Sequence, residues 1–164
     1  MHTSKWYRNL LVIALPIAVS CAQGFHAESE SSVRIALERE YAAIVHGFLR
    51  NDPNPWIERL GPEFKLILFN GSTQSREWAV SYVKNNATTF HVGTLTMRIK
   101  TLQPAAGRWV ATVEQLSDRT WSDSTGPHRL EVGAIQLETW ERRDSGWQLA
   151  SVREKEILYL RRDQ

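Results

Sequence analysis

The amino-acid sequence predicts an α+β domain: a cone in which a strongly curved antiparallel sheet wraps around a long N-terminal helix, with two further helices. Two features predict this architecture. Apolar residues recur at helical spacing early in the chain, and four long strand-like runs separated by turn-rich segments fill its second half. The order helix, helix, strand, helix and then four strands is typical of the α+β class.

The chain begins with the parts of a signal peptide, which we assign to residues 1–24. Lys5 and Arg8 make a basic start, residues 10–20 are apolar, and small residues follow at Ser20, Ala22 and Gly24. The apolar run is shorter than the roughly 20 residues that a membrane-spanning helix needs. We therefore expect an exported protein that is periplasmic, secreted or lipid-anchored, and that meets a membrane only through its leader or a lipid anchor.

Cys21 is the one cysteine of the chain, and two fates are open to it. Its context, AVSC, resembles a bacterial lipobox, in which the cysteine is lipidated and becomes the new N-terminus, although Ala18 stands where that motif usually has leucine. Cleavage after Ala22 or Gly24 would instead remove Cys21 with the leader. Under either alternative the folded part lacks cysteine, which excludes disulfides and thiol catalysis.

The first helix follows a polar linker over residues 25–32. Ser31 or Ser32 is its expected N-cap, and the stretch 51–53 (Asn-Asp-Pro) ends it. One face of this helix is predicted to be buried, because its apolar residues recur every three or four positions: Val33, Leu37, Tyr41, Ile44, Val45 and Phe48.

A short second helix is predicted over residues 54–61, because Pro55 suits its first turn and Gly61 lies past its end. A strand over 63–69 and a third helix over 75–86, capped by Ser75, come next. Four strands then complete the domain, over residues 90–102, 108–119, 128–141 and 146–157. The domain thus spans residues 33–157, and residues 158–164 form a C-terminal tail.

The charge balance and the residue pattern exclude several classes of partner. Without Lys5 and Arg8 of the leader, the 20 basic residues fall to 18 and equal the 18 acidic ones. A neutral mature chain argues against nucleic-acid binding through phosphate contacts. No histidine, cysteine or carboxylate cluster has the spacing of metal ligands and no glycine-rich phosphate loop is present, so we expect no metal and no cofactor.

Two stretches carry a resemblance to a known family. The first, residues 41–71, has a helix that ends at an Asp, a short helix, a segment of the form L-x-P-x-F and a strand followed by Gly. The second, residues 137–152, has the pattern of a hairpin: an aromatic residue, a charged turn and the motif W-x-L. This pattern, over roughly residues 33–155, resembles the nuclear transport factor 2-like superfamily, particularly its SnoaL-like and ketosteroid-isomerase-like branches. The resemblance implies the cone-shaped fold but no single function, because the fold hosts isomerases, dehydratases, hydrolases and non-catalytic modules.

The resemblance also implies where catalytic groups would stand. Ketosteroid-isomerase-like relatives place a carboxylate base on the strand after the short helix. Residues 64–76 contain no Asp, Glu or His, so that base is absent. The Asp that would hold an oxyanion falls near Gln136, whose amide can donate, and Tyr41 lies on the inner face of the first helix. The catalytic role therefore stays unassigned, with Tyr41, Gln136, Glu138 and Glu114 as candidates.

The last hairpin leaves two interpretations open. If Trp140 and Trp147 pair, the period-two alternation of strands puts them on one face with Gln136, Glu138, Ser151 and Arg153, and puts Ile135, Leu137, Thr139, Ala150 and Val152 on the other. The mixed face either lines the cone as a small-molecule pocket or forms the outer side of the sheet, and we favour the pocket. Its expected lining is Tyr41, Trp56, Trp78, Tyr82, Gln136, Trp140, Trp147 and Arg153; the alternative is that the aromatic residues are plain core.

Glu114 and Glu138 fall on neighbouring predicted strands, where they either approach each other or pair with Arg98 and Arg153. Three functional hypotheses follow. The first is an exported SnoaL-like domain that binds a small, largely apolar molecule in its cone without standard isomerase chemistry. The second is an enzyme of the same fold that uses displaced pocket groups, and the third is a homodimeric interaction module that pairs through the sheet.

Overall fold

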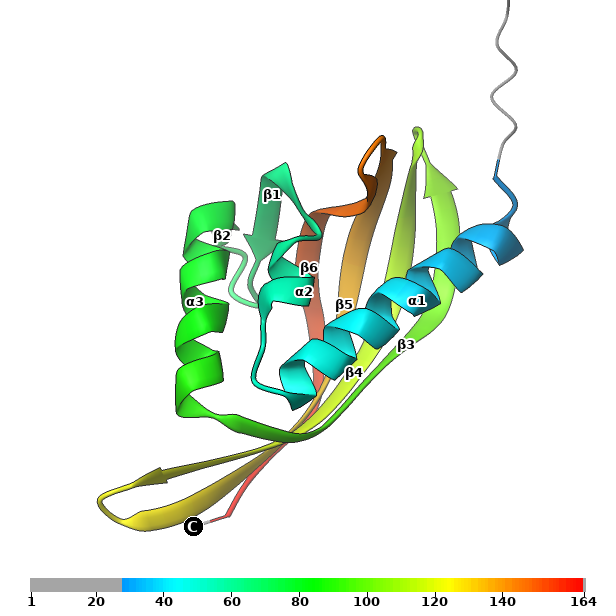
Figure 1. Cartoon of the computed structure of the whole chain (residues 1–164). Coiled ribbons are helices and arrows are strands. Elements are labelled where there is room, and N and C mark those ends of the chain that lie inside the picture. The colour runs from blue at the N-terminus through cyan, green and yellow to red at the C-terminus, as the bar shows by residue number, and fades with distance from the viewer. Residues whose placement is uncertain (1–27, 164) are drawn as a thin grey trace, which may run out of the picture.

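A computed structural model describes residues 28–163, so the predicted signal peptide and Cys21 lie outside the described residues. Two of the three helices flank one side of a long, bent sheet (Figure 1). In chain order the elements are α1 (Glu30–Leu49), α2 (Asn54–Ile57), β1 (Leu60–Ile67), β2 (Thr73–Ser75), α3 (Arg76–Thr89), β3 (His91–Ala105), β4 (Arg108–Asp123), β5 (Gly126–Arg143) and β6 (Gly146–Arg162).

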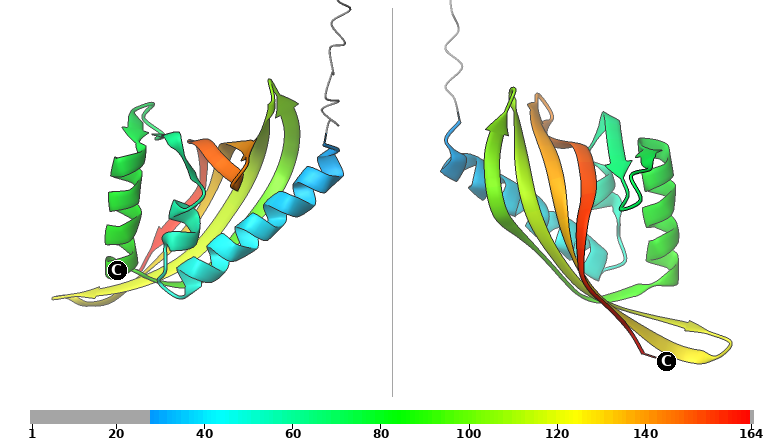
Figure 2. Two further views of the ribbon diagram at one scale, coloured as in Figure 1. Left: turned by 45° about the horizontal axis from the view of Figure 1, so that its top comes forward. Right: turned by 180° about the vertical axis from the view of Figure 1, so that it is seen from behind.

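The six strands form one open sheet in the order β2-β1-β6-β5-β4-β3. Neighbouring strands are antiparallel except β1 and β6, which run parallel, so the sheet is mixed and the prediction of a purely antiparallel sheet is wrong in this one pair. Strands β3 to β6 bend along their length, and α1 lies across the concave side (Figure 2). The predicted α+β class, with a curved sheet around a long helix and two further helices, is confirmed.

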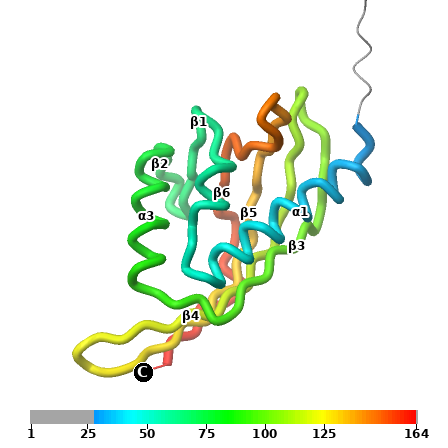
Figure 3. Tube along the Cα trace, in the orientation of Figure 1, coloured from blue at the N-terminus to red at the C-terminus, as the bar shows by residue number. Residues whose placement is uncertain are grey.

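The distal parts of β4, β5 and β6 project past the ends of α1 and α3 (Figure 3). We call this projection the arm and define it as residues 118–131 of the β4–β5 hairpin with residues 157–162 of β6. The arm exists because the predicted strands continue: β4 and β5 run to a two-residue turn, and β6 runs to Arg162. Most of the predicted C-terminal tail is therefore strand.

The core lies between α1 and the concave face of the sheet. The stripe predicted on the first helix is buried there, with Val33, Leu37, Tyr41 and Ile44 each at most 3% exposed. These side chains pack on a layer from five strands that includes Phe64, Leu102, Ala111, Val113, Trp140 and Leu149. Helix α1 is thus amphipathic, and no helix within residues 28–163 is long and apolar enough to cross a membrane.

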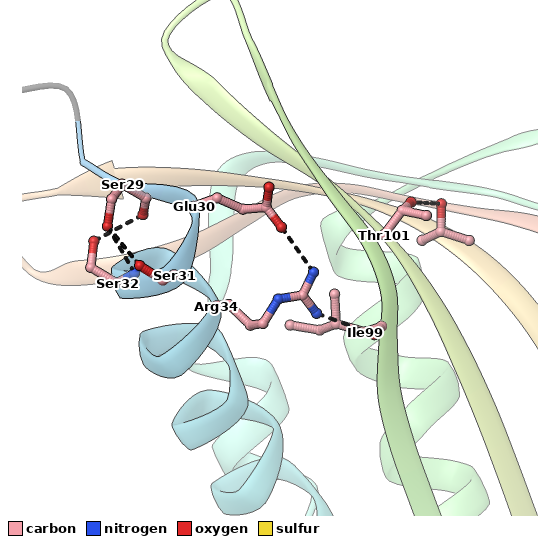
Figure 4. Close-up of polar contacts among 8 residues, drawn as sticks. Ser29, Glu30, Ser31, Ser32, Arg34, Ile99 and Thr101 are labelled. Carbon is pink, nitrogen blue, oxygen red and sulfur yellow. Dashed lines mark hydrogen bonds and ion pairs between the residues drawn. The ribbon is translucent and has the colours of Figure 1, made fainter.

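Helix α1 begins three residues before the predicted start. Its N-cap is Ser29, whose side-chain Oγ accepts from the backbone N–H of Ser32 at 3.2 Å (Figure 4). The end of the predicted linker is therefore helical, because Ser29 caps the first turn and leaves no role for Ser31 or Ser32 as cap. From the same turn, Arg34 donates to the backbone carbonyl of Ile99 on β3 at 3.3 Å, which ties α1 to the edge of the sheet.

The remaining elements differ from the predictions mainly at their ends. The short helix α2 stops at Ile57 rather than near residue 61, and β1 begins at Leu60. The three-residue strand β2 lacked an alternating pattern long enough to be predicted. Helix α3 has the predicted cap, since the Ser75 side chain accepts from the N–H of Trp78 at 3.3 Å.

Gly47 offers a test of how tightly α1 closes on α2. A Cβ at this position would lie 2.6 Å from the carbonyl oxygen of Asp52 and 2.7 Å from Cγ of Pro55. We expect Gly47→Ala to lower the free energy of unfolding by about 1–3 kcal/mol in urea denaturation, because the backbone must shift to accept the methyl group. Gly93→Ala is the matched control: its nearest neighbour would be 3.8 Å away. Equal urea midpoints for the two variants would contradict the close contact.

Candidate functional site

The last hairpin contains a bulge that decides which side chains face the core. Trp140 pairs with Leu149 and Thr139 pairs with Ser151, so Ala150 is an extra residue in β6. Trp140, Trp147 and Glu138 all lie on the buried concave face, at 0%, 6% and 2% exposed. The tryptophans therefore point inward and belong to the hydrophobic core, and neither of them lines a hollow.

The same bulge overturns part of the predicted face. Beyond Ala150 the alternation is reversed, so Val152 lies opposite Glu138 and is buried in the core. Ser151 and Arg153 are consequently on the convex side, and Arg153 is exposed rather than part of a pocket in the cone. A single extra residue reverses the faces because side chains alternate with a period of two.

Three of the predicted residues meet in the core. The Tyr41 hydroxyl on α1 donates to Oε2 of Glu138 at 2.7 Å, and Nε1–H of Trp140 lies 3.0 Å from both that oxygen and the Tyr41 hydroxyl oxygen. The rings of Tyr41 and Trp140 pack edge to face, with centroids 5.6 Å apart. We call these residues the Glu138 triad.

Burial controls the protonation of the triad. Removal from water raises the pKa of Glu138 from 4.5 to about 7, and the hydrogen bonds from Tyr41 and Trp140, which favour the carboxylate, offset only part of that rise. Burial also raises the pKa of Tyr41 well above its usual value, and the charge of Glu138 adds to this effect. Near neutral pH, Glu138 therefore exists both as acid and as carboxylate, and Tyr41 is a neutral donor.

Of the other two catalytic candidates, Gln136 lies on the same face as the triad and Glu114 on the opposite face. Gln136 is half-buried on the concave face, between Val113 and Glu154 on the neighbouring strands. Glu114 is on the convex face, where it pairs with Lys100 at 3.6 Å, so it neither approaches Glu138 nor pairs with Arg98 or Arg153, the two alternatives that the sequence left open. Glu114 lies opposite Ile135, which is three residues from Glu138 on β5. Because side chains alternate along a strand, the two carboxylates are on opposite faces of the sheet.

The remaining predicted aromatic residues fall into two groups. Trp56 is half-buried and packs edge to face on Phe64 at 5.8 Å, which makes it part of the core wall. Trp78 and Tyr82 stack on each other at 4.9 Å on the outside of α3 and are 38% and 52% exposed. They therefore do not line the inside of the cone.

The centre of the cone is filled by side chains, and the hollows lie beside it. One is a groove of about 400 Å³ between α1 and β3, which we call the α1–β3 groove. Its lining is mostly apolar and includes Tyr41, Ala42, Val45, Leu95, Met97 and Ile99. Glu38 and Arg98 add charge at its margins. The sequence offered one signal for it, the alternation of Leu95, Met97 and Ile99, but not which helix would lie beside them.

Backbone groups also face the α1–β3 groove. β3 is the last strand of the sheet, and the carbonyl of Ile99 points away from β4 to accept from Arg34. Since N–H and C=O groups of alternate residues in an antiparallel strand point to the same side, those of Met97 and Leu95 also point away from β4, to the open edge of the sheet. The groove thus combines an apolar lining with directional hydrogen-bonding groups.

A second hollow, of about 650 Å³, lies where α3 meets the root of the arm. It is lined by Phe90, Trp121 and His128 among others, and its aromatic side chains mainly contact one another: Trp121 stacks on His128 at 4.9 Å and meets Phe90 edge to face at 5.4 Å. The described residues contain no group of three or more His, Cys, Asp or Glu side chains placed to hold an ion.

Solved structures place this arrangement among known folds. A type 2 hexachlorocyclohexane dehydrochlorinase (LinA) matches with TM-score 0.62 at 14% identity, over 82% of this chain and 90% of its own. An NTF2-like protein from Cytophaga hutchinsonii matches with TM-score 0.62 at 13% identity, over 79% of this chain and 100% of its own. A conserved protein from Planctomyces limnophilus matches with TM-score 0.64 at 10% identity, over 75% of this chain and 94% of its own.

No family model matches the sequence, and no curated protein matches it. The structural likeness, at such low identity, concerns the fold alone. The chain has the nuclear transport factor 2-like fold, as the sequence resemblance implied.

The Glu138 triad predicts a distinct pH dependence of stability. The folded protein holds the Glu138 proton up to about pH 7, whereas the unfolded chain releases it near pH 4.5. Stability from this group is therefore complete below pH 4.5 and is lost as the pH rises to 7, by roughly 3 kcal/mol in total. We expect Glu138→Gln to remove this slope, measured by urea denaturation between pH 4.5 and 8.

Glu114→Gln is the control for that series, because it removes a carboxyl on the opposite face and leaves the triad intact. It should keep the pH slope of the parent protein. Identical slopes for the parent and Glu138→Gln would show that burial of Glu138 does not govern the pH dependence.

Proposed function

We propose that this is an exported domain that binds a small, largely apolar molecule with one polar end in the α1–β3 groove. The observation that carries the proposal is the groove itself. Its volume of about 400 Å³ lies within the range of small-molecule sites, roughly 300–1,000 Å³, which are typically apolar with a few directed polar groups. The groove replaces the cone centre, which we predicted as the site and which core side chains occupy.

The chemistry of the lining indicates how such a ligand would be held. Ala42, Val45 and Met97 would contact its apolar body. At the polar end of the ligand, the edge backbone of β3 would donate or accept hydrogen bonds, and the carboxylate of Glu38 would accept them. The Tyr41 ring belongs to both the groove and the triad, so ligand binding would also be felt in the core.

Acid–base catalysis is a second candidate, and the pKa of Glu138 near 7 favours it, since general acids and bases work best with a pKa near the ambient pH. The dehydrochlorinase among the structural matches is an enzyme of this fold. Binding is the better-supported proposal, because Glu138 is only 2% exposed and a ligand in the groove could exchange a proton with it only through Tyr41.

Export, with a lipid anchor on Cys21 as the alternative to a free mature chain, remains part of the proposal. It rests on the leader sequence. Mass spectrometry of the mature N-terminus distinguishes the two: a diacylglyceryl adduct on Cys21 identifies the anchor, and a start after Ala22 or Gly24 identifies the free chain.

Ligand binding can be tested by filling the groove. A panel of steroids, polyketides and small aromatic acids is screened by thermal shift, and the best compound is titrated by calorimetry. We expect Ala42→Trp to weaken binding by tenfold or more, because the indole would occupy the groove from an exposed position on α1. Ile35→Trp is the control: this residue is also exposed on α1, at 53%, but does not line the groove. Equal affinity in both variants would refute the site.

The catalytic candidate has a separate readout. Ketones from the same panel that bind are incubated in deuterated water, and exchange of the hydrogens next to the carbonyl is followed by proton NMR. If Glu138 transfers protons, Glu138→Gln abolishes the exchange and leaves the affinity within about threefold. A compound that binds without any exchange would leave the binding proposal standing and remove the catalytic one.

A further inference from the structure

The C-terminal half of β6 is an open edge of the sheet. β1 pairs with β6 only as far as Arg153, and the Phe69 N–H closes this contact by donating to Glu154 at 3.0 Å. From Lys155 to Arg162, β6 pairs with β5 on one side and with no described strand on the other. An edge of this length exposes a row of backbone hydrogen-bonding groups that another strand can use.

The side chains of this edge are unusually apolar for a surface strand. Ile157, Leu158 and Leu160 are 50%, 41% and 62% exposed, within four consecutive residues. Natural edges are usually guarded by charge, bulges or covering elements. The opposite edge of this sheet, β3, is covered by α1 and bonded by Arg34, whereas on the β6 edge Lys155 is the one cationic residue before the apolar segment.

The charges along the edge are arranged for pairing with an identical strand. Glu154 and Glu156, with Lys155 between them, precede the apolar segment, and two basic residues, Arg161 and Arg162, follow it. Parallel pairing of two copies would set like charges against each other. Antiparallel pairing instead sets Glu156 of one copy against Arg161 of the other, at both ends of the seam.

We propose that two copies of this chain associate through antiparallel pairing of their β6 edges, which would join the two sheets into one. The register that fits the faces puts Glu156 opposite Arg161 and Ile157 opposite Leu160, each twice by symmetry. Glu156 and Arg161 share the convex face, because their partners on β5 are Ile135 and Glu131. Ile157 and Leu160 share the concave face, because their partners are Ala134 and Val132.

Two further observations support a second copy as the occupant. Glu156 forms no ion pair with any described residue, and Arg161 reaches Glu131 only at 3.7 Å, so both charges are available to a partner. The start of α1 lies at the far end of the molecule from the C-terminus, away from this edge (Figure 1). A seam of two short strands is smaller than a standard protein interface, so we expect micromolar association.

The test uses charge reversal in the full-length chain, purified after processing of its own leader. In a symmetric pair, Glu156→Arg places Arg opposite Arg, and Arg161→Glu places Glu opposite Glu. We expect each variant alone to dimerise about tenfold or more weakly than the parent in sedimentation velocity over a concentration series. An equimolar mixture of the two variants should dimerise again, because each copy then meets its complement.

Circular dichroism and thermal melting establish that both variants are folded, and Leu137→Arg on the convex face of β5 serves as a second control. The parent, the mixture and Leu137→Arg should all dimerise. A monomeric parent at several hundred micromolar would overturn the proposal, as would a mixture no more associated than its components. Loss of the dimer in Leu137→Arg with retention in both edge variants would assign the contact to the sheet face and equally overturn it.

Discussion

A hydrogen bond to one buried carboxyl group, that of Glu138, holds the first helix against the sheet. Glu138 would be costly in an apolar core, and the cost is reduced in two ways: the group takes up a proton more readily, and Tyr41 and Trp140 both donate to the same oxygen. The Tyr41–Glu138 hydrogen bond joins residues 97 positions apart in the sequence. Because a hydrogen bond is directional, it fixes the rotation of α1 about its own axis as well as its position.

That rotation explains the hollow beside the core. With Tyr41 turned toward β5, the neighbouring residues on the same side of α1, Glu38, Ala42 and Val45, face the edge strand β3. Arg34 holds the first turns of the helix close to that strand. The α1–β3 groove is therefore a consequence of how the helix is anchored, and its polarity comes from an edge strand with unpaired backbone groups.

The fold could be predicted from the sequence because its signals are local. The helical stripe from Val33 to Phe48, the cap at Ser75 and the turns between the long strands each appear within a few residues. The parallel pairing of β1 with β6 is not local, and no pattern in either strand specifies its partner. Strand ends were also missed, because β6 continues with alternating polarity only up to Glu156 and then becomes apolar.

The site was predicted in part, for a similar reason. Tyr41 and Glu138 were identified because one lies on the buried stripe of a helix and the other is two residues from a core tryptophan. The exclusion of Arg153 and the inclusion of Val152 depend on the bulge at Ala150, and alanine carries no turn or bulge signal. The groove joins two segments about 50 residues apart, so its existence depends on a docking angle that only tertiary packing sets.

The place of β6 in the sheet has a consequence for the order of folding. It is the last of the described strands, yet it lies between β1 and β5 and pairs with both. The segment containing α2, β1, β2 and α3 therefore has no partner in the main sheet until residues 149–153 of β6 are in place. The pairing of β1 with β6 therefore forms later than the hairpins of β3 to β6, because long-range pairing is slower than local pairing.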